Sequence, residues 1–186
     1  LEVVKIAKAG SPHPLLYDSA ARYGNESGKD RLQIGSKGGN APVVTIIGCG
    51  NSGVGAAELA AGFGCTVRIL DVNLLAMEAA RAKLPANVSF LISNRENLMN
   101  CIADSDVVIN CIMWPKHRKD HLIYREDLKM MKEGAMIIDV ACDDEGAVET
   151  CRSTTHDDPV YYEEGILHYC VDNILLHFQE LIHKIC

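Results

Sequence analysis

The sequence predicts an α/β fold with a doubly wound parallel sheet, and three observations support this prediction. Short β-branched and apolar runs alternate with helical segments from Val43 onward. The first run, Val43-Val-Thr-Ile-Ile47, is β-branched throughout, which is typical of a parallel strand buried on both faces. The first run leads directly into a glycine-rich turn that opens a helix. Alternation at this spacing indicates βαβ units, so we expect about six strands with helices on both faces of the sheet.

The bounds of the elements follow from the apolar runs and from the residues that stop helices. Pro85 follows the second helical segment and Gly134 follows the fourth, and both residue types are common just past the end of a helix. The expected strands are Val43–Ile47, Thr66–Leu70, Val88–Ile92, Asp106–Asn110, Ala135–Asp139 and Ile166–Val171. The expected helices are Asn51–Phe63, Leu74–Lys83, Glu96–Ala103 and Arg125–Lys132.

The composition is that of one globular domain with short additions at its ends. The chain has 186 residues, of which 48% are hydrophobic and 23% are charged, within the ordinary range for a folded domain. We expect a partly helical N-terminal extension over residues 1–40 and the main domain over residues 41–173. Residues 174–186 carry apolar side chains at helical spacing, which predicts a C-terminal helix. That helix would either pack on the sheet or form an interface in a homo-oligomer, and the sequence does not choose between the two.

Charge and hydropathy exclude several classes of partner. The net charge of −7 argues against a nucleic-acid-binding protein, because phosphates require a basic surface. No apolar run approaches the roughly 18 residues of a membrane span. The eight cysteines form no CxxC pair and fall mostly inside apolar runs, which favours buried thiols in a reducing cytoplasm. His117 and His121 are four residues apart, but no third ligand accompanies them, so we expect no metal.

The most informative motif is Gly48-Cys-Gly50-Asn-Ser-Gly53. It follows a predicted strand and opens a predicted helix, which is the context of a Rossmann-type dinucleotide site. Gly48 would permit a tight turn, Gly50 would leave room for a pyrophosphate, and Gly53 would let the helix approach the strand. Asn51 and Ser52 would lie at the helix N-terminus, whose N–H groups attract phosphate.

An acidic residue follows at the expected distance. Asp71 lies 18 residues after Gly53, at the end of the second predicted strand, where a carboxylate accepts hydrogen bonds from an adenosine ribose. This carboxylate would repel the 2′-phosphate of NADP, and the following Val72 brings no compensating charge, so NAD is the expected cofactor. The alternative is that Gly50 serves packing alone and Asp71 caps the next helix.

Further cofactor contacts are expected where the fourth and fifth strands end, because ligands of such sheets bind at the carboxyl ends of the strands. Cys111 and Ile112 follow the fourth strand, and Val140 follows the fifth. Asp139 and Asp143 lie at or just past the end of the fifth strand. Asp143 could steady an iminium or departing ammonia by its charge, or move a proton if burial raised its pKa. The alternatives are a loop-capping role for Asp139 and a solvated acidic turn at Asp143.

Together with the glycine motif, four further segments resemble the alanine dehydrogenases and the related nicotinamide nucleotide transhydrogenase domain. The Thr-Thr-His-Asp-Asp-Pro stretch is more specific than the glycine motif and is closer to the alanine dehydrogenases. The physical alternative for that stretch is local capping between two strands, and for His168 a role as a core histidine. The resembling segments are Ile69–Asn73, Asp127–Asp143, Arg152–Pro159 and His168–Asn173.

The resemblance implies a fold, an activity and two further site residues. It implies an oxidoreductase that interconverts L-alanine with pyruvate and ammonia, using NAD. Asp143 matches the family's carboxylate beside the nicotinamide, and Asn173 matches an asparagine that faces the nicotinamide. The family carries a substrate domain ahead of its nucleotide domain, and residues 1–40 are too few to form one. We therefore expect the NAD-binding domain without its usual substrate domain.

Two other functions stay open at this point. The first is an opine-type enzyme of the same superfamily, which joins a keto acid to an amine by reductive amination. The second is a non-catalytic NAD-binding module. The sole tryptophan, Trp114, follows the fourth strand and is expected close to the cofactor cleft.

Overall fold

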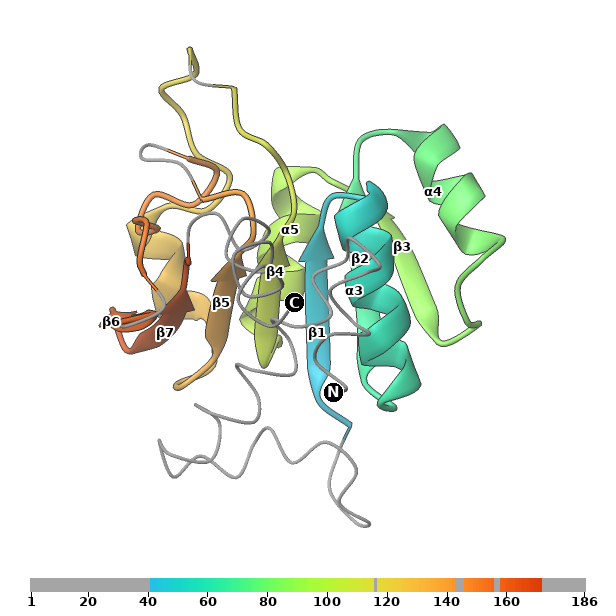
Figure 1. Ribbon diagram of the computed structural model, residues 1–186, viewed down its shortest axis with the longest axis horizontal. Coiled ribbons are helices and arrows are strands. Elements are labelled where there is room, and N and C mark those ends of the chain that lie inside the picture. Colours follow the sequence, from blue (N-terminus) through green and yellow to red (C-terminus); the bar gives the residue numbers. More distant parts are fainter. Residues whose placement is uncertain (1–40, 116, 143–145, 156–157, 172–186) are drawn as a thin grey trace, which may run out of the picture.

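The computed structural model describes residues 41–115, 117–142, 146–155 and 158–171. Within them the chain forms one seven-stranded sheet in the order β3-β2-β1-β4-β5-β7-β6, and Figure 1 shows this arrangement. Neighbouring strands are parallel except for β6, which pairs antiparallel with β7. The strands are β1 (Val43–Ile47), β2 (Thr66–Asp71), β3 (Val88–Ile92), β4 (Val107–Asn110), β5 (Met136–Asp139), β6 (Val160–Glu163) and β7 (Ile166–Tyr169).

The strand order reverses at β1, which pairs with β2 on one side and with β4 on the other. Chains leaving β1 and β4 turn to opposite faces of such a sheet, and the crevice between them is where doubly wound proteins bind ligands. The glycine motif begins directly after β1, so the fold places it at this crevice.

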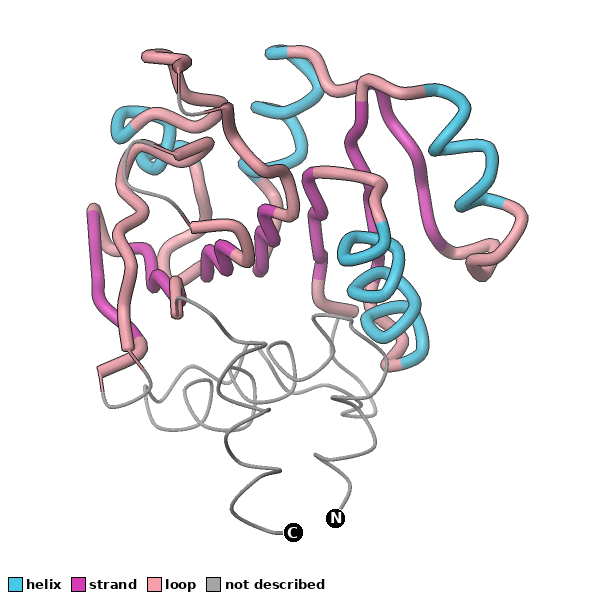
Figure 2. Tube along the Cα trace, turned by 45° about the horizontal axis from the view of Figure 1, so that its top comes forward, coloured by secondary structure: helices cyan, strands magenta, loops and turns pink. Residues whose placement is uncertain are grey.

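Helical segments cover both faces of the sheet, as predicted, and Figure 2 shows them on either side of the row of strands. Alanines of α3 and apolar residues of α4 share one core cluster with the sheet. Apolar residues of α5 and η3 share the other. The segments are α3 (Asn51–Gly62), α4 (Leu74–Arg81), α5 (Arg95–Ala103) and the 3-10 helix η3 (Arg125–Met130).

The two clusters explain why the strands are continuously apolar in the sequence. Ile46 lies in the first cluster and its neighbour Ile47 in the second, and both side chains have an exposed fraction of 0%. Successive side chains of a strand point to opposite faces. Because both faces are covered, every position of a central strand favours an apolar residue.

The structure confirms the predicted fold class and adds one strand. The missed strand, β6, joins β7 through Glu164 and Gly165, both at positive φ (49° and 80°), the pattern of a two-residue hairpin turn. The predicted helix over Arg125–Lys132 is observed as a 3-10 helix over Arg125–Met130. The predicted N-terminal extension (1–40) and C-terminal helix (174–186) lie outside the described residues. Each helix in the described part of the chain is too short or too polar to cross a membrane.

Candidate functional site

Gly48 makes the turn that leaves β1. Its φ is +105°, a left-handed conformation that favours glycine. A Cβ at this position would lie 3.0 Å from Cγ1 of Ile112 and 3.3 Å from the carbonyl carbon of Cys111. The glycine loop is therefore pressed against the segment that follows β4. This contact places Cys111 and Ile112 beside the loop, and their role as cofactor contacts stays a prediction.

The other two glycines of the motif have different surroundings. A Cβ on Gly53 would lie 2.0 Å from the carbonyl oxygen of Gly48, so the close approach of α3 to the loop requires glycine there. Gly50 has an ordinary φ of −80°, and a Cβ on it would meet no atom within 4 Å. Neither backbone conformation nor packing within the described structure requires a glycine at this exposed position. The space beside Gly50 fits a ligand that approaches the backbone closely, as a pyrophosphate does.

The N-terminus of α3 suits an anion. Gly50 is the residue before the helix, no side chain caps the helix there, and its first turn carries no acidic residue. By contrast, Asn73 and Asn94 cap α4 and α5 through hydrogen bonds to backbone N–H groups. Uncapped N–H groups at a helix start carry partial positive charge and bind phosphate oxygens. Asn51 and Ser52 supply these groups at the start of α3.

Asp71 at the end of β2 is tied to the glycine loop. Its Oδ2 accepts a hydrogen bond from the backbone N–H of Cys49 at 2.6 Å, and its Oδ1 accepts one from Asn73 at 2.8 Å. Each carboxylate oxygen can accept a further hydrogen bond. The capping alternative for Asp71 is wrong, because Asn73 caps α4. Val72 is 76% exposed beside the carboxylate.

A buried polar pair joins the carboxyl ends of β4 and β5. Asn110 and Asp139 are partners in the strand register, and Nδ2 of Asn110 donates to Oδ1 of Asp139 at 2.9 Å. Oδ1 of Asn110 accepts from the N–H of Ile112, and Oδ1 of Asp139 accepts from Ala141. Asp139 thus caps the loop after β5, which was the alternative weighed from the sequence. Sequence reasoning missed Asn110, although two polar residues closing neighbouring apolar strands are a usable signal.

The residues directly after these strands complete this side of the site. Val140 is half-buried, and its N–H donates to the carbonyl oxygen of Asn110 at 3.0 Å. Burial and the negative charge of Asp139 raise the pKa of the Cys111 thiol to about 12. The thiol is therefore neutral at physiological pH, and Cys111 contributes its backbone to the wall beside Gly48.

The loop between β4 and η3 rises beyond the tips of the strands in Figure 1. Trp114 is buried in this loop, and its Nε1 donates to the carbonyl oxygen of Asp120 at 2.8 Å. The guanidinium carbon of Arg118 lies over the Trp114 ring, 4.2 Å from the ring centroid. Nδ1 of His121 donates to the carbonyl oxygen of Gly146 at 2.7 Å. His117 is exposed, and one ring nitrogen of His121 is occupied by this contact.

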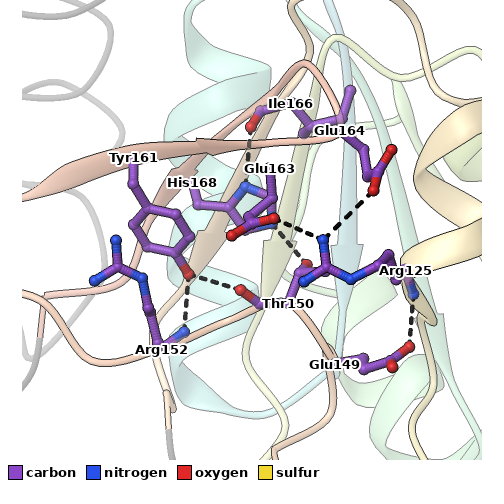
Figure 3. A network of polar contacts seen from close by, with 9 residues as sticks. All are labelled: Arg125, Glu149, Thr150, Arg152, Tyr161, Glu163, Glu164, Ile166 and His168. Carbon is purple, nitrogen blue, oxygen red and sulfur yellow. Dashed lines mark hydrogen bonds and ion pairs between the residues drawn. The ribbon is translucent and has the colours of Figure 1, made fainter.

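A second polar network fixes the segment after the β5 loop against β6 and β7 (Figure 3). His168 is fully buried, its Nδ1 donates to the carbonyl oxygen of Ile166, and its Nε2 accepts from the hydroxyl of Thr150 at 2.9 Å. Tyr161 stacks on His168 and bonds the backbone of Thr150 and Arg152. Burial lowers the pKa of His168. His168 is thus a core histidine that is neutral in the folded state.

Three of the predicted functional positions lie outside the described residues. They are Asp143, Asn173 and His156 of the Thr-Thr-His-Asp-Asp-Pro stretch. The roles of Asp143, Asn173 and His156 therefore remain predictions. In the sequence, Asp143 falls between Ala141, whose N–H donates to Asp139, and Gly146, whose carbonyl accepts from His121.

The sheet order, the glycine loop at the reversal point and the acid at the end of β2 define a Rossmann-type dinucleotide-binding domain. The family model described as alanine dehydrogenase/PNT, C-terminal domain, matches residues 19–177, and the chain belongs to this family. Membership confirms the predicted family, its oxidoreductase class and NAD as the family's cofactor.

Curated relatives agree with this assignment. The chain is 39% identical over 132 residues to an alanine dehydrogenase of Staphylococcus saprophyticus, a match that covers 70% of this chain and 36% of that protein. It is 37% identical over 150 residues to an alanine dehydrogenase of Methanococcus maripaludis, covering 80% of this chain and 40% of that one. The chain thus spans well under half the length of the curated relatives it matches.

Solved structures show the same fold. An L-alanine dehydrogenase matches with a TM-score of 0.79 at 29% identity, over 92% of this chain and 47% of that one. A transhydrogenase from Sinorhizobium meliloti matches with a TM-score of 0.70 at 21% identity, over 98% of this chain and 54% of that one. The second likeness supports the fold alone.

Proposed function

We propose that this chain is the NAD-binding domain of an enzyme that oxidises L-alanine to pyruvate and ammonia. The observation that carries the proposal is the space beside Gly50, at the uncapped start of α3 and next to the Asp71 carboxylate. A dinucleotide needs this combination: a phosphate site with open backbone and, one strand away, an acceptor for ribose hydroxyls.

Each part of the site has a defined task in this proposal. The N–H groups of Asn51 and Ser52 bind the pyrophosphate, while Asp71 accepts hydrogen bonds from the adenosine ribose. Cys111, Ile112 and Val140 form the wall at the nicotinamide half of the cofactor. When bound, the cofactor would accept the hydride. The protein residues bind the cofactor, orient it and exclude water from the site.

The site favours NAD over NADP. The Asp71 carboxylate is fixed by Cys49 and Asn73, so it cannot swing away from an added 2′-phosphate without losing two hydrogen bonds. A phosphate placed there would face a negative charge at short range, which is unfavourable. The exposed neighbour Val72 offers no positive charge in compensation.

Asp143 and Asn173 complete the proposal on the substrate side. Asp143 would stabilise the positive charge that develops on the amine nitrogen, or accept its proton, and Asn173 would orient the nicotinamide. Family membership and the anchoring of the chain on both sides of Asp143 support these roles. Turnover of L-alanine is measured as NADH formation, and Asp143→Asn is expected to abolish it while leaving NADH binding intact. An Asp143→Asn protein with unchanged turnover would remove Asp143 from the mechanism.

The binding step is tested by titrating the chain with NADH and, separately, NADPH. The single tryptophan, Trp114, lies on the loop that follows β4, so its emission is expected to report on an occupied site. We expect saturable quenching by NADH and at least about tenfold weaker binding of NADPH, equivalent to about 1.4 kcal/mol. Absence of binding to either nucleotide, confirmed by calorimetry, would overturn the proposal.

A matched pair of substitutions sharpens the titration. Gly50→Ala adds a methyl group to the open space where the pyrophosphate is expected, so it should abolish NADH binding without changing thermal stability. Gly62→Ala makes the same change at the other end of α3, where a Cβ also meets no atom within 4 Å. The Gly62 variant should bind NADH normally. Equal NADH affinity of the two variants would exclude Gly50 from the site.

We also propose a cytoplasmic location and assembly into a homo-oligomer. The cysteines of the described residues are free and mostly buried, which supports a reducing cytoplasm. Homo-oligomer formation is proposed through the amphipathic segment 174–186 and is tested by light scattering of the purified chain. A strictly monomeric chain at micromolar concentration would contradict it.

A further inference from the structure

The buried pair of Asn110 and Asp139 lies where the two loops of the nicotinamide side begin. Asn110 has an exposed fraction of 1%, as does Asp139, and their side chains are joined at 2.9 Å. A polar pair at the buried ends of β4 and β5 is not needed for the core, because apolar residues of similar size satisfy both faces. We infer that Asn110 and Asp139 are positioning residues that hold the two loops in register around the nicotinamide half of the cofactor. This inference rests on the proposed function.

One side of the pair leads to the glycine loop. The carboxamide oxygen of Asn110 accepts from the N–H of Ile112 at 3.2 Å. Ile112 in turn packs against Gly48, where a Cβ would lie 3.0 Å from its Cγ1. The contact chain therefore runs from Asp139 through Asn110 and Ile112 to the turn that begins the pyrophosphate site.

The other side leads to the loop after β5. Oδ1 of Asp139 accepts from both Asn110 and the N–H of Ala141, and Ala141 lies two positions before Asp143 in the sequence. A second connection joins the same two loops farther out, where His121 donates to Gly146 and Ile123 forms a parallel bridge with Val148. The two loops are thus fastened to each other at both ends.

The position of the pair predicts a selective effect on binding. The adenosine half of the cofactor is held by Asp71 and the start of α3, which belong to β1, β2 and the segments directly after them. The pair at β4 and β5 lies on the other side of the reversal point. A change in the pair should weaken binding of the whole dinucleotide more than binding of ADP-ribose, which lacks the nicotinamide.

The experiment is a cycle of nearly isosteric substitutions. Asn110→Asp places two carboxylates opposite each other. Asp139→Asn keeps an acceptor for the donors of Asn110 and Ala141. The double variant restores an amide opposite a carboxylate. Because like charges repel at this distance and opposed amide and carboxylate groups attract, NADH affinity should fall about tenfold in Asn110→Asp and recover to within about threefold in the double variant. Asp139→Asn should stay close to the unmodified chain.

Thr45→Val is the matched control. Thr45 is fully buried in β1 and shares a side-chain hydrogen bond of 2.7 Å with Ser105, away from the carboxyl ends of β4 and β5. This variant should lose stability but keep its ratio of NADH to ADP-ribose affinity. Thermal melting is recorded for every variant, so that the ratio is compared among folded proteins.

The possible outcomes separate the inference from the function on which it rests. If the unmodified chain binds neither NADH nor ADP-ribose, the proposed function fails. If it binds both with equal affinity, or if Asn110→Asp weakens both ligands alike, the pair has no positioning role and the inference is overturned. A selective loss for NADH that is restored in the double variant supports it.

Discussion

Oδ2 of Asp71 lies 2.6 Å from the backbone nitrogen of Cys49, the residue between the first two glycines of the motif. The acid at the end of β2 is therefore bound to the glycine loop by a direct hydrogen bond. The N–H of Gly48 donates to the carbonyl oxygen of Leu70 as well, so the loop after β1 is held by consecutive residues of β2. The ribose acceptor and the phosphate site are positioned by the same contacts.

Asp71→Asn should change cofactor preference as well as affinity. The amide loses the negative charge, and one of its two polar atoms becomes a donor that faces the N–H of Cys49 or of Asn73. We expect NADH binding to weaken by about tenfold or more while NADPH binding improves relative to it. Parallel fluorescence titrations measure the ratio. A ratio equal to that of the unmodified chain would show that Asp71 does not face the ribose.

Gly53→Ala should disrupt both the fold and the site. A Cβ at Gly53 would lie 2.0 Å from the carbonyl oxygen of Gly48, so α3 or the loop must move. Overpacking of this kind costs about 1–3 kcal/mol, which denaturant unfolding measures, and NADH binding should be lost. Gly50→Ala, three residues earlier and with open space, should keep the stability of the unmodified chain. Equal stability of the two variants would contradict the close approach of α3.

His168 should make stability depend on pH between neutral and mildly acidic conditions. Burial lowers its pKa below the ordinary value of about 6.5, so the unfolded chain binds a proton more readily than the folded one. The contribution of His168 is complete above pH ~6.5 and is lost as the pH falls towards the folded-state pKa. His168→Gln should be less stable at pH 8, with a gap that narrows towards pH 5. Chemical unfolding at each pH measures this gap, and a constant gap would refute the prediction.

Buried thiols should resist modification in the folded protein. Burial and Asp139 raise the pKa of Cys111 to about 12, and contact with the Cys170 thiol together with burial raises that of Cys142. Because the thiolate is the reactive form, alkylation at pH 7.5 should leave both residues unmodified in the native chain. All eight cysteines should react in denaturant. Peptide mapping by mass spectrometry identifies the sites, and rapid native labelling of Cys142 would contradict its burial.

Prediction from the sequence worked where a local pattern has one physical cause. Val43–Ile47 and Val88–Ile92 match the observed strands in both bounds, because each is a mainly apolar run that is followed by a turn or polar residue (Gly48 and Ser93). The apolar pattern did not predict the strand Val160–Glu163, because its residues are only partly buried and apolar and polar residues do not alternate clearly along it. This edge strand depends on its hairpin with β7, and the turn at Glu164 and Gly165 was the available signal.

The residues of the candidate site also fall into those that a local motif predicts and those that only strand register brings together. The three glycines and Asp71 could be predicted because each role needs one residue type at a fixed distance from a strand. Asn110 and Asp139 each close an apolar strand, but their contact could not be predicted, because the two residues are 29 positions apart and only the register of β4 against β5 brings them together.

The sequence by itself determined the order of strands and helices, the glycine loop and the acid that follows it. These features depend on local periodicity and on backbone conformations that only glycine adopts readily. The tertiary structure alone decided that Asp71 binds the glycine loop while Asn73 caps α4, and that Asn110 meets Asp139. Hydrogen bonds between distant segments depend on strand order and register, which are set by the packing of the whole sheet and leave no pattern in a short stretch of sequence.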